Sequence, residues 1–139
     1  YVPVSLREYD PKVRLQKITD IVEHYGNQIG LISIDGFSDL VDDFNSIEQT
    51  QEVINALMKW TTTWRCHITG IIHLNPSKDS AKPQGHLGSF ILRKAETIIN
   101  VQKESINESN SLVLCGAGRN IDFPEFKFEV QNGIPIETI

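Results

Sequence analysis

Two side chains that can do acid–base or metal chemistry lie near the ends of apolar stretches. Asp35 directly follows the apolar run 29–34, and His73 lies near the end of a second run, 66–74. In open α/β sheets, ligands bind beyond the carboxyl ends of the strands. An aspartate there holds magnesium, usually through water, beside nucleotide phosphates, and a histidine there contacts a phosphate or accepts a water-mediated hydrogen bond. Asp35 and His73 are therefore the first candidates for a site.

Each of these residues also has a structural interpretation. Many aspartates cap the turn that follows a strand. A neutral histidine serves equally well as a hydrogen-bonded residue at the edge of a sheet. The residue types alone leave both interpretations open, so the elements that position them matter.

The elements around Asp35 and His73 alternate between helix and strand. Asp10 before Pro11 predicts a helix whose amides are capped by the Asp10 carboxylate and which ends at Gly26. Ser46, followed three residues later by Gln49, predicts a capping box and a second helix. Strand, helix and strand then follow one another as in doubly wound α/β folds. The nearly continuous apolar run ending before Asp35 predicts a strand buried on both faces.

The rest of the chain predicts further strands and one short helix. Residues 1–6 have strand character, residues 75–86 form a polar loop, and a helix opens at Gly88 and runs to about Ala95. Strands are expected at 97–102, 111–115 and 125–130, the last two antiparallel. In the last strand Phe126, Phe128 and Val130 are expected to face inward. We expect one domain spanning residues 1–139, of mixed α/β class, with a mostly parallel sheet and antiparallel C-terminal strands.

Net charge, cysteine spacing and the length of the apolar runs exclude some classes of function. The chain has 139 residues and a net charge of −5, which argues against a uniformly basic nucleic-acid coat. Cys66 and Cys115 have the spacing of neither a metal site nor a disulfide framework, so a reduced, cytoplasmic setting is expected. No apolar run approaches the roughly 18 residues of a membrane span. We therefore expect no membrane association.

The order of the motifs resembles that of replicative hexameric helicases. His73-Leu74-Asn75-Pro76 is followed by a polar loop, by Gly88-Ser89 and residues 92–95, and by the strand at 98–101. Over about residues 4–130 the chain is similar to DnaB-like helicases, to phage primase-helicases and especially to the RepA-type ATPases of plasmids and mobilizable elements. This resemblance implies a RecA-like (P-loop NTPase) fold, with a sheet flanked by helices, whose N-terminal part is missing.

The resemblance also implies roles for individual residues. Asp35 matches the Walker B aspartate, which holds Mg²⁺ beside ATP, usually through water, and His73 matches the polar sensor. Arg119 follows the strand at 111–115 in a glycine-rich turn and matches an arginine finger that reaches the γ-phosphate of a neighbouring subunit. Ala117 replaces the lysine that the family often has two residues before the finger. Alternatively, Arg119 is a surface residue that pairs with Asp122.

Two loops are implied to face the channel of a homo-oligomeric ring and to touch single-stranded DNA. They are residues 36–46 and 75–87. The second loop carries side chains suited to phosphate-backbone contact, although an ordinary solvated loop would look similar. These candidates are Lys78, Lys82, Gln84 and His86. The first loop is acidic and repels phosphate, through Asp39, Asp42 and Asp43.

No glycine-rich loop ending in Gly-Lys-Ser or Gly-Lys-Thr occurs in the 139 residues. The resemblance places that loop and the catalytic carboxylate before residue 1, so this chain alone is expected to bind nucleotide weakly and not to hydrolyse it.

Three hypotheses for the function remain. The first is part of an ATP-driven helicase used in replication or mobilization of a plasmid or mobile element. The others are a RecA-like regulator that does not translocate DNA, and a plain interaction module.

Overall fold

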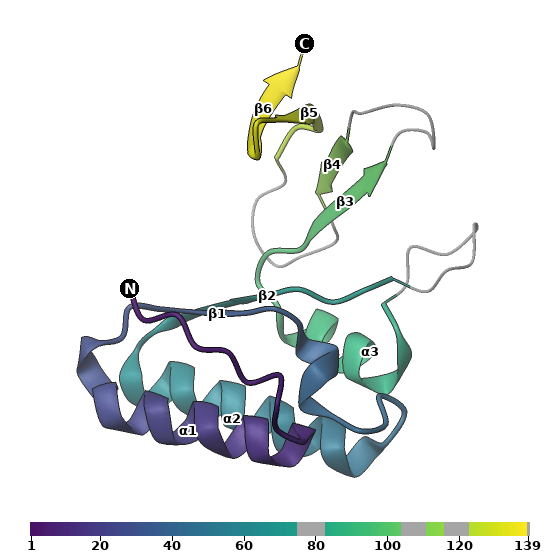
Figure 1. The fold of residues 1–139 in the computed structure, drawn as a ribbon. Coiled ribbons are helices and arrows are strands. Elements are labelled where there is room, and N and C mark those ends of the chain that lie inside the picture. Colours follow the sequence, from purple (N-terminus) through teal and green to yellow (C-terminus); the bar gives the residue numbers. More distant parts are fainter. Residues whose placement is uncertain (75–82, 104–110, 116–122, 139) are drawn as a thin grey trace. The chain divides into compact units, whose positions relative to one another are not determined.

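The computed structural model describes residues 1–74, 83–103, 111–115 and 123–138 (Figure 1). The chain divides into two compact units, Tyr1–Ile91 and Leu92–Ile139, and each is described by itself. The candidate residues Lys78, Lys82 and Arg119 lie outside the described residues. A single domain over residues 1–139 stays a prediction.

The first unit contains a parallel pair of strands. β1 (Leu31–Ile34) pairs with β2 (His67–Gly70) in a register that runs from Leu31 opposite His67 to Ile34 opposite Gly70. The helix α1 (Pro11–Tyr25) precedes β1, and α2 (Ile47–Trp64) connects the two strands. Short 3₁₀ turns follow α1 (η1, Gly26–Gln28) and β1 (η2, Phe37–Leu40). This part of the chain therefore has the predicted order of helix, strand, helix and parallel strand.

Both long helices lie on the same side of the parallel pair (Figure 1). Ile34 is buried and Ile32 half-buried, whereas Leu31 is 60% exposed and Ser33 is also exposed. Successive residues of a strand point to opposite faces, so only one face of β1 is covered within the described residues. The prediction of a strand buried on both faces was wrong, because α1 and α2 pack against the same face.

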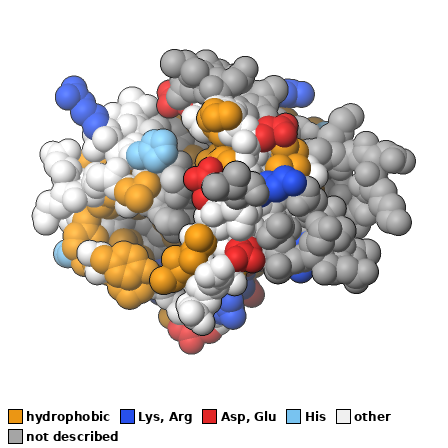
Figure 2. Space-filling view, turned by 90° about the horizontal axis from the view of Figure 1, so that it is seen from above, with side chains coloured by type: hydrophobic (Ala, Val, Ile, Leu, Met, Phe, Trp, Pro, Cys, Tyr) orange, Lys and Arg blue, Asp and Glu red, His pale blue; other side chains and the backbone are white. Residues whose placement is uncertain are grey.

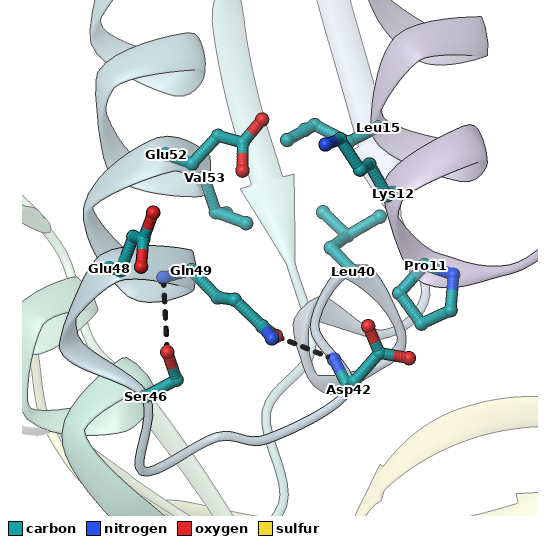
Figure 3. Close-up of a pocket in the computed structure, with 10 residues that line it drawn as sticks. All are labelled: Pro11, Lys12, Leu15, Leu40, Asp42, Ser46, Glu48, Gln49, Glu52 and Val53. Atoms are coloured by element: carbon teal, nitrogen blue, oxygen red, sulfur yellow. Dashed lines mark hydrogen bonds between the residues drawn. The ribbon is translucent and has the colours of Figure 1, made fainter.

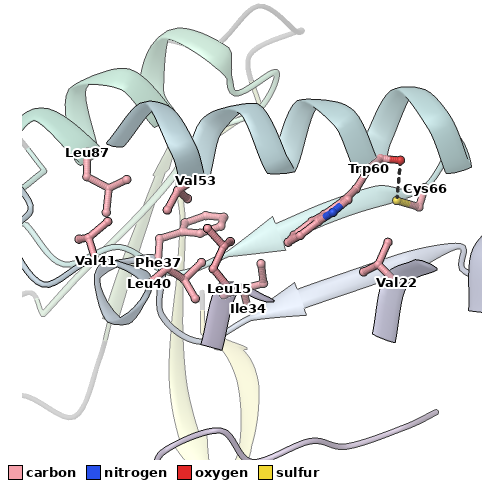
Figure 4. Packing of buried hydrophobic residues seen from close by; sticks show 10 residues of the cluster. All are labelled: Leu15, Val22, Ile34, Phe37, Leu40, Val41, Val53, Trp60, Cys66 and Leu87. Atoms are coloured by element: carbon pink, nitrogen blue, oxygen red, sulfur yellow. Dashed lines mark hydrogen bonds between the residues drawn. The ribbon is translucent and has the colours of Figure 1, made fainter. Parts of the chain in front are cut away.

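The core of the first unit lies between the helices and the strands (Figure 4). Trp60 and Val53 of α2 and Val22 of α1 are each 2% exposed or less. Leu87, from the start of α3 (Gly85–Lys94), is fully buried in the same cluster. These contacts bury the apolar stripes that predicted amphipathic helices.

Both ends of α1 and the start of α2 agree with the predicted boundaries, but the capping bonds differ in part. The Ser46 hydroxyl accepts a hydrogen bond from the Gln49 amide over 3.3 Å, which confirms the cap of α2. The Gln49 side chain does not reach back to Ser46; its Oε1 accepts from the amides of Asp42 (2.8 Å) and Asp43 (3.2 Å) instead. The Asp10 carboxylate makes no capping bond and is exposed to water, so that prediction was wrong.

Two other predicted elements differ from the structure. Residues 1–6 form no strand, and Tyr1, Val2 and Val4 are exposed, because an extended segment becomes a strand only where a neighbouring backbone completes its hydrogen-bond ladder. The helix α3 begins at Gly85 rather than at Gly88. It begins earlier because two amides of its first turn find hydrogen-bond acceptors. The Gly88 amide donates to the Gln84 carbonyl (3.1 Å), and the Leu87 amide donates to the Phe44 carbonyl (3.1 Å).

The second unit contains a four-stranded antiparallel sheet. Its strands are β3 (Ile99–Lys103), β4 (Ser111–Cys115), β5 (Phe126–Gln131) and β6 (Ile134–Thr138), paired in that order. The antiparallel C-terminal strands were predicted, but β6 and its turn at Asn132-Gly133 were not. The protein is thus a mixed α/β chain with a small parallel sheet and a separate antiparallel sheet.

One face of this second sheet is apolar and open. Phe126 is 39% and Val130 60% exposed, so of the three residues expected to face inward only Phe128 is partly covered. A hollow of about 400 Å³ on this face is lined mainly by apolar side chains of all four strands. Exposed hydrophobic side chains are also visible at the surface drawn in Figure 2.

None of the helices in the described residues has the length and apolar character to cross a membrane.

Candidate functional site

The carboxyl ends of β1 and β2 lie at the same edge because the two strands are parallel and in register. Asp35 follows the last residue of β1 directly. Beyond β2 the backbone stays bonded to the chain that leaves β1: the Ile71 amide donates to the Ile34 carbonyl (3.1 Å), and the Ile71 carbonyl accepts from the Phe37 amide (2.8 Å). This edge is the candidate site.

His73 lies beyond the end of β2 rather than inside it. The predicted strand 66–74 is shorter in the structure and ends at Gly70, because β1 turns away after Asp35 and no longer offers a pairing edge. The His73 side chain is exposed. Its main-chain carbonyl accepts from the Gln84 amide over 3.3 Å. His73 therefore lies near the same edge as Asp35, but on irregular backbone.

The Asp35 side chain is exposed and makes no hydrogen bond or ion pair with any described residue. It is therefore available to bind a water molecule or a hydrated cation. Among the described residues no group of three or more His, Cys, Asp and Glu side chains is arranged to hold a metal ion. A magnesium ion held through water beside nucleotide phosphates takes a single carboxylate from such a strand end, and Asp35 fits that requirement.

The described chain resumes at Pro83, and Gln84 lies beside His73. Leu74 and Pro83 form an isolated antiparallel bridge, and the bond between Gln84 and His73 follows it. Gln84 is half-buried, whereas His86 is exposed in the first turn of α3. His86 was predicted in a polar loop and is helical instead, because α3 begins at Gly85. Of the four candidate DNA contacts, these two can be placed: Gln84 lies just before α3 and His86 in its first turn.

The two segments that leave the candidate edge are also bonded to each other. The Phe44 carbonyl accepts from the Leu87 amide (3.1 Å) at the start of α3. Gly85, with φ +63°, lies so close to Phe44 that a β-carbon there would overlap the Phe44 carbonyl oxygen. Because of this contact, the acidic loop after η2 and the first turn of α3 are held against each other.

An acid-rimmed hollow lies between the first turns of α1 and α2 (Figure 3). It has a volume of about 250 Å³, with Asp42, Glu48 and Glu52 at its rim and Lys12 as the opposing base. Three carboxylates against one ammonium repel phosphate groups, so neither nucleotide nor DNA is expected here. Asp35 and His73 do not line this hollow. It was not predicted, although the acidic residues that surround it are plain in the sequence.

Arg14 was not singled out by the sequence either. Its guanidinium donates to three main-chain carbonyls, those of Asp39 (2.9 Å), Leu6 (3.1 Å) and Arg7 (3.3 Å). An arginine on an amphipathic helix ordinarily suggests a solvated face, so no sequence signal indicated this contact. Arg14 connects α1 to the turn that follows Asp35.

The Cys66 thiol has a structural role. It is 7% exposed and lies 3.7 Å from the Trp60 carbonyl, to which it donates. Burial raises the pKa of this thiol above its ordinary value, and the backbone hydrogen bond of Cys66 opposes the rise. A buried, protonated thiol is a poor nucleophile and a poor metal ligand.

No protein-family model and no curated protein sequence matches this chain.

Proposed function

We propose that this chain is the magnesium-side portion of a RecA-like ATPase that acts on single-stranded DNA, in the replication or mobilization of a plasmid or mobile element. The observation that supports it best is the exposed carboxylate of Asp35 directly after a parallel strand, with His73 beyond the adjacent strand. Nucleotide-binding α/β proteins use this edge for ligand contact. The proposal requires a phosphate-binding loop upstream of Tyr1.

Within this proposal each residue has a defined task. Asp35 orients the water ligands of magnesium, which neutralises charge on the nucleotide phosphates when it is bound. His73 forms a hydrogen bond to a phosphate or a water molecule at the same edge, and so senses the bound nucleotide. Gln84 and His86, with Lys78 and Lys82, contact the DNA backbone.

Arg119 contributes a positive charge to the site of the neighbouring copy in a ring. An arginine supplied in this way accelerates phosphoryl transfer by about 10³ to 10⁵.

A nucleotide-dependent regulator is the second candidate, and the surface charge favours it. The chain carries a net charge of −5, and the acid-rimmed hollow and the Asp42-Asp43 loop both lie in the first unit. Such a surface repels DNA. The same Asp35 would then serve a switch that hydrolyses ATP slowly and acts on a protein partner.

The test is magnesium-dependent ATP hydrolysis by the chain extended upstream through its own reading frame, with and without single-stranded DNA. The helicase-like function predicts turnover that DNA stimulates and that Asp35→Asn removes. Turnover that ignores DNA supports the regulator. Absence of hydrolysis with the complete upstream region present overturns both and leaves an interaction module.

A further inference from the structure

Phe37 is the second residue after Asp35, and its side chain is buried. It is 6% exposed and belongs to the core cluster that contains Leu40 and Val53 (Figure 4). Its ring lies against Gly70, the last residue of β2, so closely that a β-carbon at Gly70 would overlap ring atoms Cε2 and Cζ. The ring of Phe37 therefore occupies the space that the β-carbon of any other residue at position 70 would need.

The backbone on both sides of Asp35 is bonded to a single residue of the neighbouring segment. Ile34 accepts from the Ile71 amide (3.1 Å), and Phe37 donates to the Ile71 carbonyl (2.8 Å). Asp35 and Gly36 bridge these two bonds. Because the Asp35 carboxylate has no partner among the described residues, its position depends on the backbone that carries it.

We propose that Phe37 is a positioning residue for Asp35, and that Gly70 is glycine to admit its ring. The ring seated on Gly70 holds the Phe37 amide against Ile71 and thereby fixes the turn that presents the carboxylate. Gly70 is not among the residues with positive φ, so alanine there is resisted by the ring and not by the backbone conformation. The catalytic consequence rests on the proposed function, whereas the seating of the ring is testable without it.

The competing explanation is that Phe37 only fills the core. Its replacement would then lower the free energy of unfolding and leave Asp35 where it is. Gly70→Ala and Phe37→Leu separate the two explanations, because leucine lacks the ε and ζ atoms that the new methyl group would strike. Gly70→Ala alone should displace the turn, and adding Phe37→Leu should relieve the overlap. Gly30→Ala is the matched control, since a β-carbon at Gly30 meets nothing within 4 Å.

The first experiment is amide hydrogen exchange, with ¹H–¹⁵N NMR, on the 139-residue chain. In Gly70→Ala we expect the Phe37 amide to exchange at least about tenfold faster, which corresponds to a loss of about 1.4 kcal/mol in protection. The backbone amide resonance of Asp35 should also shift. The double variant should recover part of this protection, because the overlap with the new methyl group is relieved while the ring is lost, and Gly30→Ala should match the wild type. An unchanged Phe37 amide and Asp35 resonance in Gly70→Ala would overturn the proposal. If Gly70→Ala does not fold, Phe37→Leu alone decides: faster exchange of the amide of residue 37, which donates to the Ile71 carbonyl, supports positioning, and exchange at the wild-type rate overturns it.

The second experiment measures ATP hydrolysis by the upstream-extended chain, well below the melting temperature of each variant. A carboxylate misplaced by about 1 Å lowers kcat by up to about a hundredfold, so we expect Gly70→Ala to lose between about tenfold and about a hundredfold in kcat. The KM for ATP should stay within about twofold, while half-maximal activation requires more magnesium. Adding Phe37→Leu should restore kcat at least in part. A stable Gly70→Ala variant with wild-type kcat and magnesium dependence overturns the proposal. An inactive wild type instead refutes the proposed function, and the exchange experiment still tests the positioning.

Discussion

The guanidinium of Arg14 donates a hydrogen bond to the main-chain carbonyl of Asp39 over 2.9 Å, and so ties the turn after Asp35 to α1. The same side chain also holds the carbonyls of Leu6 and Arg7. The turn is thus fastened on two sides, by Arg14 at Asp39 and by Ile71 at Phe37. A mobile carboxylate at the end of β1 would be a poor ligand for a hydrated cation, and these contacts restrict the backbone that carries it.

Arg14→Met is expected to lower the free energy of unfolding by about 1–3 kcal/mol, because three carbonyls lose a charged donor while the aliphatic part of the side chain remains. Urea unfolding followed by circular dichroism measures the change. Arg7→Met is the control, since the Arg7 side chain is exposed and its carbonyl is unaffected by the substitution. Equal stability of the two variants would show that the Arg14 bonds contribute nothing.

Gln49→Ala is expected to destabilise the first unit by about 1–2 kcal/mol, because the amides of Asp42 and Asp43 lose their shared acceptor. The amides of residues 42 and 43 should also exchange faster. Gln51→Ala, an exposed glutamine on the same helix, is expected to change neither quantity. The expectation fails if the two variants unfold at the same urea concentration.

Alkaline pH is expected to destabilise the protein through Cys66. Burial raises the pKa of this thiol above its ordinary value of 9.0, so the folded state keeps a proton that the unfolded chain loses. The stabilising contribution is therefore complete below about pH 9 and is lost as pH rises through the folded pKa. Unfolding curves between about pH 8 and pH 10.5 should show a steeper loss of stability in the wild type than in Cys66→Ala. Parallel losses in the two proteins would contradict this account.

Gly133→Ala is expected to cost about 1 kcal/mol, because Gly133 has φ +81° in the turn between β5 and β6. A β-carbon there meets nothing within 4 Å, so the cost comes from the backbone alone. The melting temperature should therefore fall in Gly133→Ala and stay near the wild-type value in Gly30→Ala. A neutral Gly133→Ala would mean that the turn adopts another conformation in solution.

The sequence predicted the helices and strands best where contacts between residues close in the sequence determine them. Pro11, Gly26 and Ser46 marked the ends of α1 and α2 correctly, and β4 has its predicted residues. The strand β6 was not predicted, although the Asn132-Gly133 pair before it is a strong hairpin signal.

Features that depend on distant contacts were not predictable from the sequence. Whether one or both faces of β1 are covered depends on where α1 and α2 pack, and an apolar run does not report that. The start of α3 depends on the Phe44 carbonyl, which is 41 residues before Gly85 in the chain. In the site, the position of Asp35 directly after β1 followed from the pattern, whereas His73 was expected inside the second strand and lies beyond its end. The contacts of Arg14 and Phe37 did not follow from the pattern, since nothing in their spacing distinguishes them from ordinary surface and core residues.

The most direct test of the central claim compares two neighbouring exposed aspartates in the upstream-extended chain. Asp35→Asn removes the carboxylate at the end of β1, whereas Asp39→Asn leaves the Asp39 carbonyl that Arg14 binds. Magnesium-dependent ATP hydrolysis in the presence of single-stranded DNA is measured for both. We expect Asp35→Asn to lose at least about a hundredfold in kcat and Asp39→Asn to stay within about threefold of the wild type. Equal activity of the two variants would contradict the assignment of Asp35 as the magnesium-side carboxylate.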